Sequence, residues 1–168
     1  MFPSSVRKAK FITVSEIDSF SRIRSQPSGS TKPLAEQAIK RGFARILGEK
    51  GTFRDWGGEK SDLYTTRAQI KGNRVAAAIA FKGKGTSGKL VPAKMGKNGD
   101  QINRLFEEPA QLFLVVYGGQ IEPSIISQMQ AFAMGIAIGG RTVYYGVVDG
   151  TDLARIIAAY PNCFPSPR

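Results

Sequence analysis

Residues 62–82, DLYTTRAQIKGNRVAAAIAFK, decide the fold of this chain. Two runs of strand-forming residues, 62–70 and 74–82, flank the turn signal Gly72-Asn73, and this pattern predicts a β-hairpin. The second run is almost wholly apolar, which is typical of a central strand covered on both faces. A buried helix would also suit its alanines, but the turn favours the hairpin. The hairpin therefore predicts a sheet with a layer of structure on each side.

The rest of the chain alternates helical and strand patterns around this hairpin. Helical spacing of apolar residues predicts helices over 34–47, 100–108, 123–138 and 151–159. Apolar runs predict strands over 111–117 and 141–148, with a further short strand over 51–56. This alternation indicates an α/β domain in which helices flank a central mixed sheet. We expect that domain to span residues 31–160, after an accessory segment and linker over 1–30 and before a tail over 161–168.

The charge of the chain is concentrated in one segment. The sequence holds 24 Lys+Arg against 13 Asp+Glu, and residues 63–99 contain eight of the basic residues and no carboxylate. Solubility alone does not require acids to be excluded from a segment, so the pattern indicates a polyanionic partner. Within this segment, residues 83–99 form a Gly- and Lys-rich loop whose lysines we expect to contact phosphates: Lys84, Lys89, Lys94 and Lys97. No aromatic residue lies between 82 and 105, which favours contact with the backbone of a duplex over stacking on single-strand bases.

The residue types that are missing exclude several classes of protein. The sequence has no histidine and one cysteine, Cys163, so it cannot form a Ser-His-Asp triad, a Cys-His dyad, a zinc-type cluster or an intrachain disulfide. A metal site would need oxygen ligands, which favours Mg²⁺ or Mn²⁺. No stretch resembles a bilayer span or a signal-peptide core. We therefore expect a cytoplasmic protein with no membrane partner.

The hairpin predicts a candidate catalytic pair at its open end. Pairing around Gly72-Asn73 puts Asp62 beside Lys82, within a residue of register, where the strand enters the basic loop. A carboxylate that binds Mg²⁺ and a lysine that orients water or balances charge on phosphorus suit metal-assisted phosphodiester cleavage. Lys84 follows Lys82 on the same face if the strand continues. The alternative is a cross-strand ion pair without function.

The order of helix, three strands, helix and strand resembles the core of the PD-(D/E)XK nuclease superfamily, over roughly residues 31–148. In this chain Glu36 resembles the acid of the first helix, Asp62 the motif aspartate and Lys82 the motif lysine. The resemblance implies a restriction-endonuclease-like core, Mg²⁺ or Mn²⁺ held by Asp62 and Glu36, and catalysis by these two acids with Lys82. It implies DNA as the partner, with RNA as an alternative. Family members often place a polar residue of the next helix near the site. Of Asp100 and Gln101, which open that helix here, Asp100 is explained as its N-cap, so Gln101 is the better candidate, and we expect it to contact the nucleic acid.

The sequence departs from the family pattern at the middle acid. Ala80 stands where the family has Asp or Glu, and Ser61 stands where it has Pro. Either another carboxylate, such as Glu36 or Glu59, takes over, or the site is inactive. The sequence thus predicts a metal-dependent DNA endonuclease, with an inactive nucleic-acid-binding module of the same fold as the alternative.

Two further expectations stay open. Residues 83–89, GKGTSGK, match part of a phosphate-binding P-loop, but Leu90 replaces the Ser/Thr that would hold Mg²⁺ and Pro92 disfavours a helix directly after the loop. A nucleotide-binding protein is therefore a third interpretation, which fewer features of the sequence support. The apolar helix expected over 123–138 suits the core, and it is also compatible with a homodimer or a larger complex.

Overall fold

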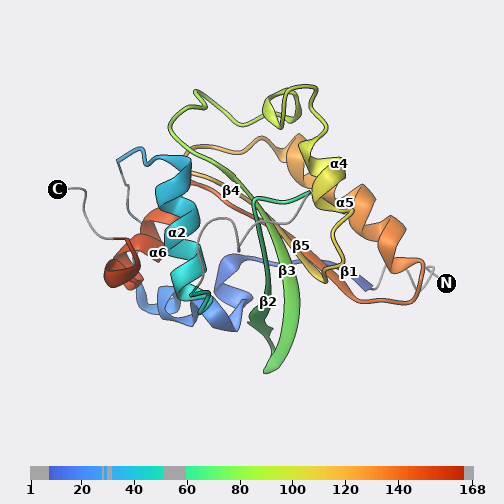
Figure 1. Cartoon of the computed structure of the whole chain (residues 1–168), viewed down its shortest axis with the longest axis horizontal. Helices are drawn as coiled ribbons and strands as arrows, with labels where there is room; N and C mark the ends of the chain where they lie inside the picture. Colours follow the sequence, from blue (N-terminus) through green and yellow to red (C-terminus); the bar gives the residue numbers. More distant parts are fainter. Residues whose placement is uncertain (1–7, 28, 30–31, 51–59, 165–168) are drawn as a thin grey trace.

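The computed structural model describes residues 8–27, 29, 32–50 and 60–164 (Figure 1). At its centre is a five-stranded sheet with the order β1-β5-β4-β3-β2. β1, β5, β4 and β3 run parallel to one another, whereas β2, at the edge next to β3, is antiparallel to β3. The strands are β1 (Ala9–Phe11), β2 (Leu63–Ile70), β3 (Asn73–Lys82), β4 (Leu112–Tyr117) and β5 (Val143–Val148). The prediction of an α/β fold with a mixed central sheet is confirmed.

Helices cover both faces of this sheet. Helices α2 and α6 lie on one face together with the N-terminal 3-10 segments, and α4 and α5 lie on the other (Figure 1). The helices are α2 (Glu36–Ile46), α4 (Gln101–Leu105), α5 (Pro123–Ala137) and α6 (Gly150–Ala159), and the 3-10 segments are η1 (Val14–Glu16), η2 (Asp18–Ser25), η3 (Pro92–Lys94) and η4 (Pro161–Cys163). The strand expected over 51–56 and the candidate acid Glu59 lie outside the described residues. In the part of the chain that the structure describes, no helix is long and apolar enough to cross a membrane.

Strand β3 is buried on both faces, as its apolar sequence predicts. Ile79 and Phe81 point into the core beneath α2, where the Phe81 ring meets that of Phe43 at 5.2 Å and 80°. Ala78 and Ala80 belong to the opposite core, beneath α4 and α5. Alanine is the side chain that lets a helix approach a central strand closely, so the alanines of β3 are explained by packing within a sheet.

The N-terminal segment is built into the same fold. β1 pairs in parallel with β5, with Lys10 opposite Tyr144. Phe20 and Ile23 of η2 are fully buried in the core that also contains Phe43. The described part of residues 1–30 therefore supplies one edge of the sheet and part of the core.

The hairpin turn lies one residue earlier than expected. Lys71 and Gly72 are its central residues, with φ of 52° and 79°, and Ile70 pairs with Asn73. Positive φ at both central positions is the geometry of a type I′ turn, which matches the twist of the flanking strands. The expected Gly72-Asn73 turn is therefore wrong by one position.

A β-bulge shifts the register again toward the open end. The bulge lies between Thr65 and Ala68, where the N–H of Arg67 donates to the Thr65 hydroxyl at 3.1 Å instead of to the partner strand. Beyond it Leu63 pairs with Ile79. The residue before Leu63 is Asp62, so it lies beside Ala80, and the expectation that it lies beside Lys82 is wrong. The position of the turn and the bulge each shift the pairing of β2 with β3 away from the expected register.

Candidate active site

Asp62 lies directly before the first residue of β2 and is hydrogen-bonded to β3. Its backbone N–H donates to the carbonyl of Ile79 at 3.1 Å, and its carboxylate Oδ2 accepts the N–H of Phe81 at 2.8 Å. Asp62 therefore uses its side chain to continue the pairing of the two strands. This contact fixes the carboxylate at the C-terminal end of β3, two residues from Lys82 across the pair, so the corrected register keeps Asp62 in the site.

Glu36 reaches the same place from helix α2. It is the first residue of α2, and the segment before the helix accepts the N–H of Lys84 on the carbonyl of Leu34 at 2.9 Å. Gly83 allows the close approach, since a Cβ there would lie 2.7 Å from the Cα of Glu36. Glu36 and Asp62 line one cavity of about 230 Å³, together with Gln37 and Lys40.

The charges at this cavity influence one another. The pKa of Glu36 is raised, first by partial burial and then by the neighbouring carboxylate of Asp62, while the ammonium groups of Lys82 and Lys40 act to lower it. Two carboxylates that repel one another are stabilised by a cation between them. Glu36, Asp62 and Lys82, which the sequence singles out, are thus brought together by the fold.

Gln101 is also brought to this cluster. It begins α4, and its Nε2 donates to Asp62 Oδ2 at 3.2 Å, while its Oε1 is buried and has no partner among the described residues. In this position its amide holds the Asp62 carboxylate, which differs from the nucleic-acid contact that the sequence suggests. The adjacent Asp100 pairs with Arg104 at 3.5 Å and is not part of the cluster.

The oxygen atoms of the cluster fit a magnesium ion. Among the described residues, none donates a hydrogen bond to the carboxylate of Glu36 or to Oδ1 of Asp62. Mg²⁺ is commonly held by one or two carboxylates, with water and substrate phosphate completing its coordination. Within the described ranges, no group of three or more His, Cys, Asp and Glu residues is assembled. The protein would therefore supply two carboxylates, Glu36 and Asp62, to Mg²⁺ or Mn²⁺.

The basic loop presents all four of its predicted phosphate-binding lysines, Lys84, Lys89, Lys94 and Lys97, to solvent. Lys94 differs, because its ammonium donates to the carbonyls of Ser87 at 2.6 Å and Lys89 at 3.1 Å. Its ammonium therefore contacts the loop itself, and its contact with phosphate stays a prediction.

The loop lacks the helix that a P-loop requires. After residues 83–89, the N–H of Leu90 donates to the carbonyl of Gln120, and Leu90 forms an isolated bridge with Ile121. A short 3-10 segment follows, and the next α-helix begins only at Gln101. Among the described elements, no α-helix begins directly after the loop, so the loop does not have the arrangement that binds nucleotide phosphates in P-loop proteins.

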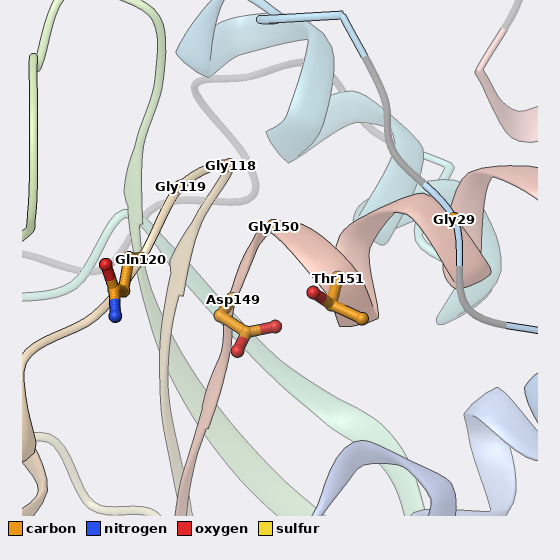
Figure 2. A pocket seen from close by; sticks show the side chains of 7 residues that line it. All are labelled: Gly29, Gly118, Gly119, Gln120, Asp149, Gly150 and Thr151. Atoms are coloured by element: carbon orange, nitrogen blue, oxygen red, sulfur yellow. The ribbon is translucent and has the colours of Figure 1, made fainter.

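A larger cavity, of about 470 Å³, lies past the C-terminal ends of β4 and β5 (Figure 2). Its lining consists largely of glycine backbone with the side chains of three polar residues, Gln120, Asp149 and Thr151. The Asp149 carboxylate accepts the N–H of Asp152 at 3.0 Å and caps α6, as its place before the helix predicts. The described residues that line this cavity include no lysine and no pair of carboxylates, so the smaller cavity is the better candidate for chemistry.

Sequence reasoning missed Lys40, Gln37 and Tyr117. Lys40 follows Glu36 by four residues and therefore lies on the same face of α2, which is a signal that the sequence carries. Tyr117 carries no comparable signal, because its hydroxyl meets the basic loop only through the pairing of β3 with β4.

Comparison with known proteins finds no relative. No family model matches the chain, and no curated protein and no solved structure matches it either.

Proposed function

We propose that this protein is a metal-dependent endonuclease that hydrolyses phosphodiester bonds of DNA, with a restriction-endonuclease-like core. The observation that carries the proposal is that Glu36 and Asp62 line one cavity at the end of β3, where Lys82 directly follows Phe81, the residue whose N–H binds the Asp62 carboxylate. These residues lie in successive parts of the chain: at the start of α2, directly before β2 and at the end of β3. Two carboxylates and a lysine at the mouth of a basic loop are the groups that metal-assisted phosphodiester cleavage needs.

Each residue of the cluster has a distinct role in this proposal. Glu36 and Asp62 hold the metal ion, which would polarise a phosphoryl oxygen and activate water. Lys82 orients the attacking water or neutralises charge that develops on the phosphate. Gln101 holds Asp62 in place through its amide, and Phe81 does so through its backbone N–H. The carboxylate of Asp62 is thus fixed before substrate binds.

The charge distribution favours a nucleic acid as substrate. The acid-free segment 63–99 begins directly after Asp62, and the loop that leaves β3 carries Lys84, Lys89 and Lys97 exposed to solvent. Each lysine that neutralises a phosphate releases a counterion, so binding should weaken steeply with salt. DNA is the substrate we favour, and RNA is the alternative that the same charges allow.

One observation favours an inactive nucleic-acid-binding module instead. Ala80 is fully buried and lies beside Asp62, at the position where the resembled family has an acid. Among the described residues, which do not include Glu59, the site therefore has two carboxylates where such a nuclease has three. A protein of this kind would bind DNA in a salt-dependent way and would not cut it.

Cleavage of plasmid DNA separates the two functions. Purified protein is incubated with supercoiled and linear DNA, and with an RNA duplex, in Mg²⁺ or Mn²⁺ and in EDTA. We expect metal-dependent cleavage by the wild type that is lost in Asp62→Asn and in Lys82→Ala. Asp100→Asn is the matched control, since Asp100 is an exposed aspartate outside the cluster, and it should cleave like the wild type.

The result that rejects the nuclease is equally clear. Salt-sensitive DNA binding without cleavage in either metal supports the binding module. Cleavage that persists in both Asp62→Asn and Lys82→Ala would show that a contaminating nuclease or another site is responsible.

A further inference from the structure

The loop after β3 is held from inside by a buried tyrosine. The hydroxyl of Tyr117 donates to the carbonyl of Gly88 at 2.6 Å and lies 3.2 Å from the carbonyl oxygen of Thr86. Tyr117 is only 5% exposed and belongs to β4, where it pairs with Lys82 of β3. The loop is therefore anchored to the strand beside the candidate active site.

Lys94 binds two further carbonyls of the loop, the one between those of Thr86 and Gly88 and the one that follows Gly88. Its ammonium donates to Ser87 at 2.6 Å and to Lys89 at 3.1 Å. Four consecutive carbonyl oxygens, those of residues 86–89, are thus contacted by only two side chains. Since the acid-free segment offers no carboxylate to Lys94, these carbonyls are its acceptors.

This arrangement turns three backbone N–H groups outward. In a trans peptide the N–H points opposite to the C=O, and the described residues contain no cis peptide bond. The N–H groups of Ser87 and Lys89 therefore point away from Tyr117, and that of Gly88 points away from Lys94. Over the described ranges of the chain, no acceptor binds any of these three N–H groups. Gly88 has φ of +68°, a conformation that occurs in the backbone turns whose successive N–H groups bind anions.

We propose that the N–H groups of Ser87, Gly88 and Lys89 bind one phosphodiester of the DNA backbone, with the Lys89 ammonium as its counter-charge. Tyr117 and Lys94 are positioning residues that keep the carbonyls of the loop turned inward. The site explains why part of this loop resembles a P-loop without the following helix, because backbone N–H groups meet the phosphate in both cases. The inference rests on the DNA-binding part of the proposed function and does not require cleavage.

The test is DNA binding by the full chain in EDTA, where no metal-dependent cleavage occurs. A short DNA duplex is titrated into ¹⁵N-labelled protein, and the amide resonances of Ser87, Gly88 and Lys89 are followed by NMR. We expect all three to shift as the duplex binds. Tyr117→Phe removes one hydroxyl and no charge, and it should weaken binding about fivefold, as the loss of one hydrogen bond would.

Tyr64→Phe is the matched control. The Tyr64 hydroxyl also donates to a backbone carbonyl, that of Pro109 at 3.0 Å, but it lies away from the basic loop, so this variant should bind like the wild type. Lys94→Met is the second loop variant, and it should lose the amide shifts of residues 87–89.

The proposal is overturned if Tyr117→Phe binds DNA like the wild type, or if the three amides do not move at saturating duplex. The cleavage assay in Mg²⁺ is scored separately. Amide shifts without cleavage leave this site standing and reject the nuclease, whereas cleavage without amide shifts rejects this site alone.

Discussion

Gly83→Ala should displace Glu36 and remove most of the cleavage activity. A Cβ at residue 83 would lie 2.7 Å from the Cα and 2.9 Å from the Cβ of Glu36, whereas ordinary contacts begin at 3.4 Å. The first turn of α2 must therefore move by about 1 Å, and a displacement of that size in catalytic geometry costs about 100-fold in rate. Overpacking of this kind costs about 1–3 kcal/mol of stability, so the variant should still fold.

The measurement is the single-turnover rate of Mg²⁺-dependent plasmid cleavage, with the thermal midpoint recorded alongside. Gly85→Ala is the control, because a Cβ there would meet nothing within 4 Å, and it should cleave and melt like the wild type. A Gly83→Ala variant that cleaves at the wild-type rate would refute the placement of Glu36 in the site. Equal losses in both variants would point to the flexibility of the loop instead.

Three further predictions concern the same cluster. Gln101→Ala should lower the affinity for Mn²⁺ by about 10- to 100-fold, as the loss of an outer partner of a metal ligand does, and an unchanged metal titration would contradict this. Glu36 has a raised pKa, so the folded state holds its proton more tightly than the unfolded chain and loses stability as pH rises through that pKa. Glu36→Gln should therefore abolish cleavage yet raise the melting temperature at pH 7. This gain in melting temperature should vanish at the low pH where the Glu36 carboxyl of the wild type is itself protonated. A lower melting temperature of the variant at pH 7 would argue against the raised pKa of Glu36. Ala80→Glu should cost about 3 kcal/mol or more in urea unfolding, because it buries an unpaired carboxylate, and an unchanged midpoint would mean that the position has room for the missing acid.

The elements that the sequence predicts well are those with a local apolar pattern. Strand β3 was expected over 74–82 and occupies Asn73–Lys82, and α5 was expected over 123–138 and occupies Pro123–Ala137. β3 is a continuous apolar run of strand length beside a turn, and α5 buries residues at helical spacing, namely Ile125, Met129, Ala133 and Ala137. The convergence of Glu36 with Asp62 also agrees with expectation, since the order of elements brings both to the C-terminal end of β3.

The register of the hairpin is harder to predict, because it depends on single side chains. A lysine with positive φ is uncommon, so nothing in the sequence favours Lys71 over Asn73 as a turn residue. The bulge arises where the Thr65 hydroxyl, which donates to Glu49 at 2.7 Å, also accepts the N–H of Arg67. Such a contact depends on a neighbour outside the hairpin, and the sequence of the hairpin alone does not reveal it.

The partners of Gln101 and Lys94 are hidden for a different reason. Gln101 reaches Asp62 across 39 positions of the chain, and only the docking of α4 on the sheet brings them together. Lys94 looks like any other lysine of the basic loop until the carbonyls of Ser87 and Lys89 turn toward it. Residue type predicts the charge of a side chain, while the fold decides whether that charge faces a ligand or the protein.

The pairing of β1 with β5 has a consequence for how the chain is made. Residues Ala9–Phe11 are synthesised long before their partner strand, Val143–Val148. Contacts between such distant residues slow folding, and β4 presents an open edge to other chains until β5 docks beside it. The hydrogen bond that Lys8 Nζ donates to the carbonyl of Gly140, at 2.7 Å, can form only after Gly140 has been synthesised. A nascent chain that stalls before residue 143 would therefore be prone to aggregate through the edge of β4, with β1 left unpaired.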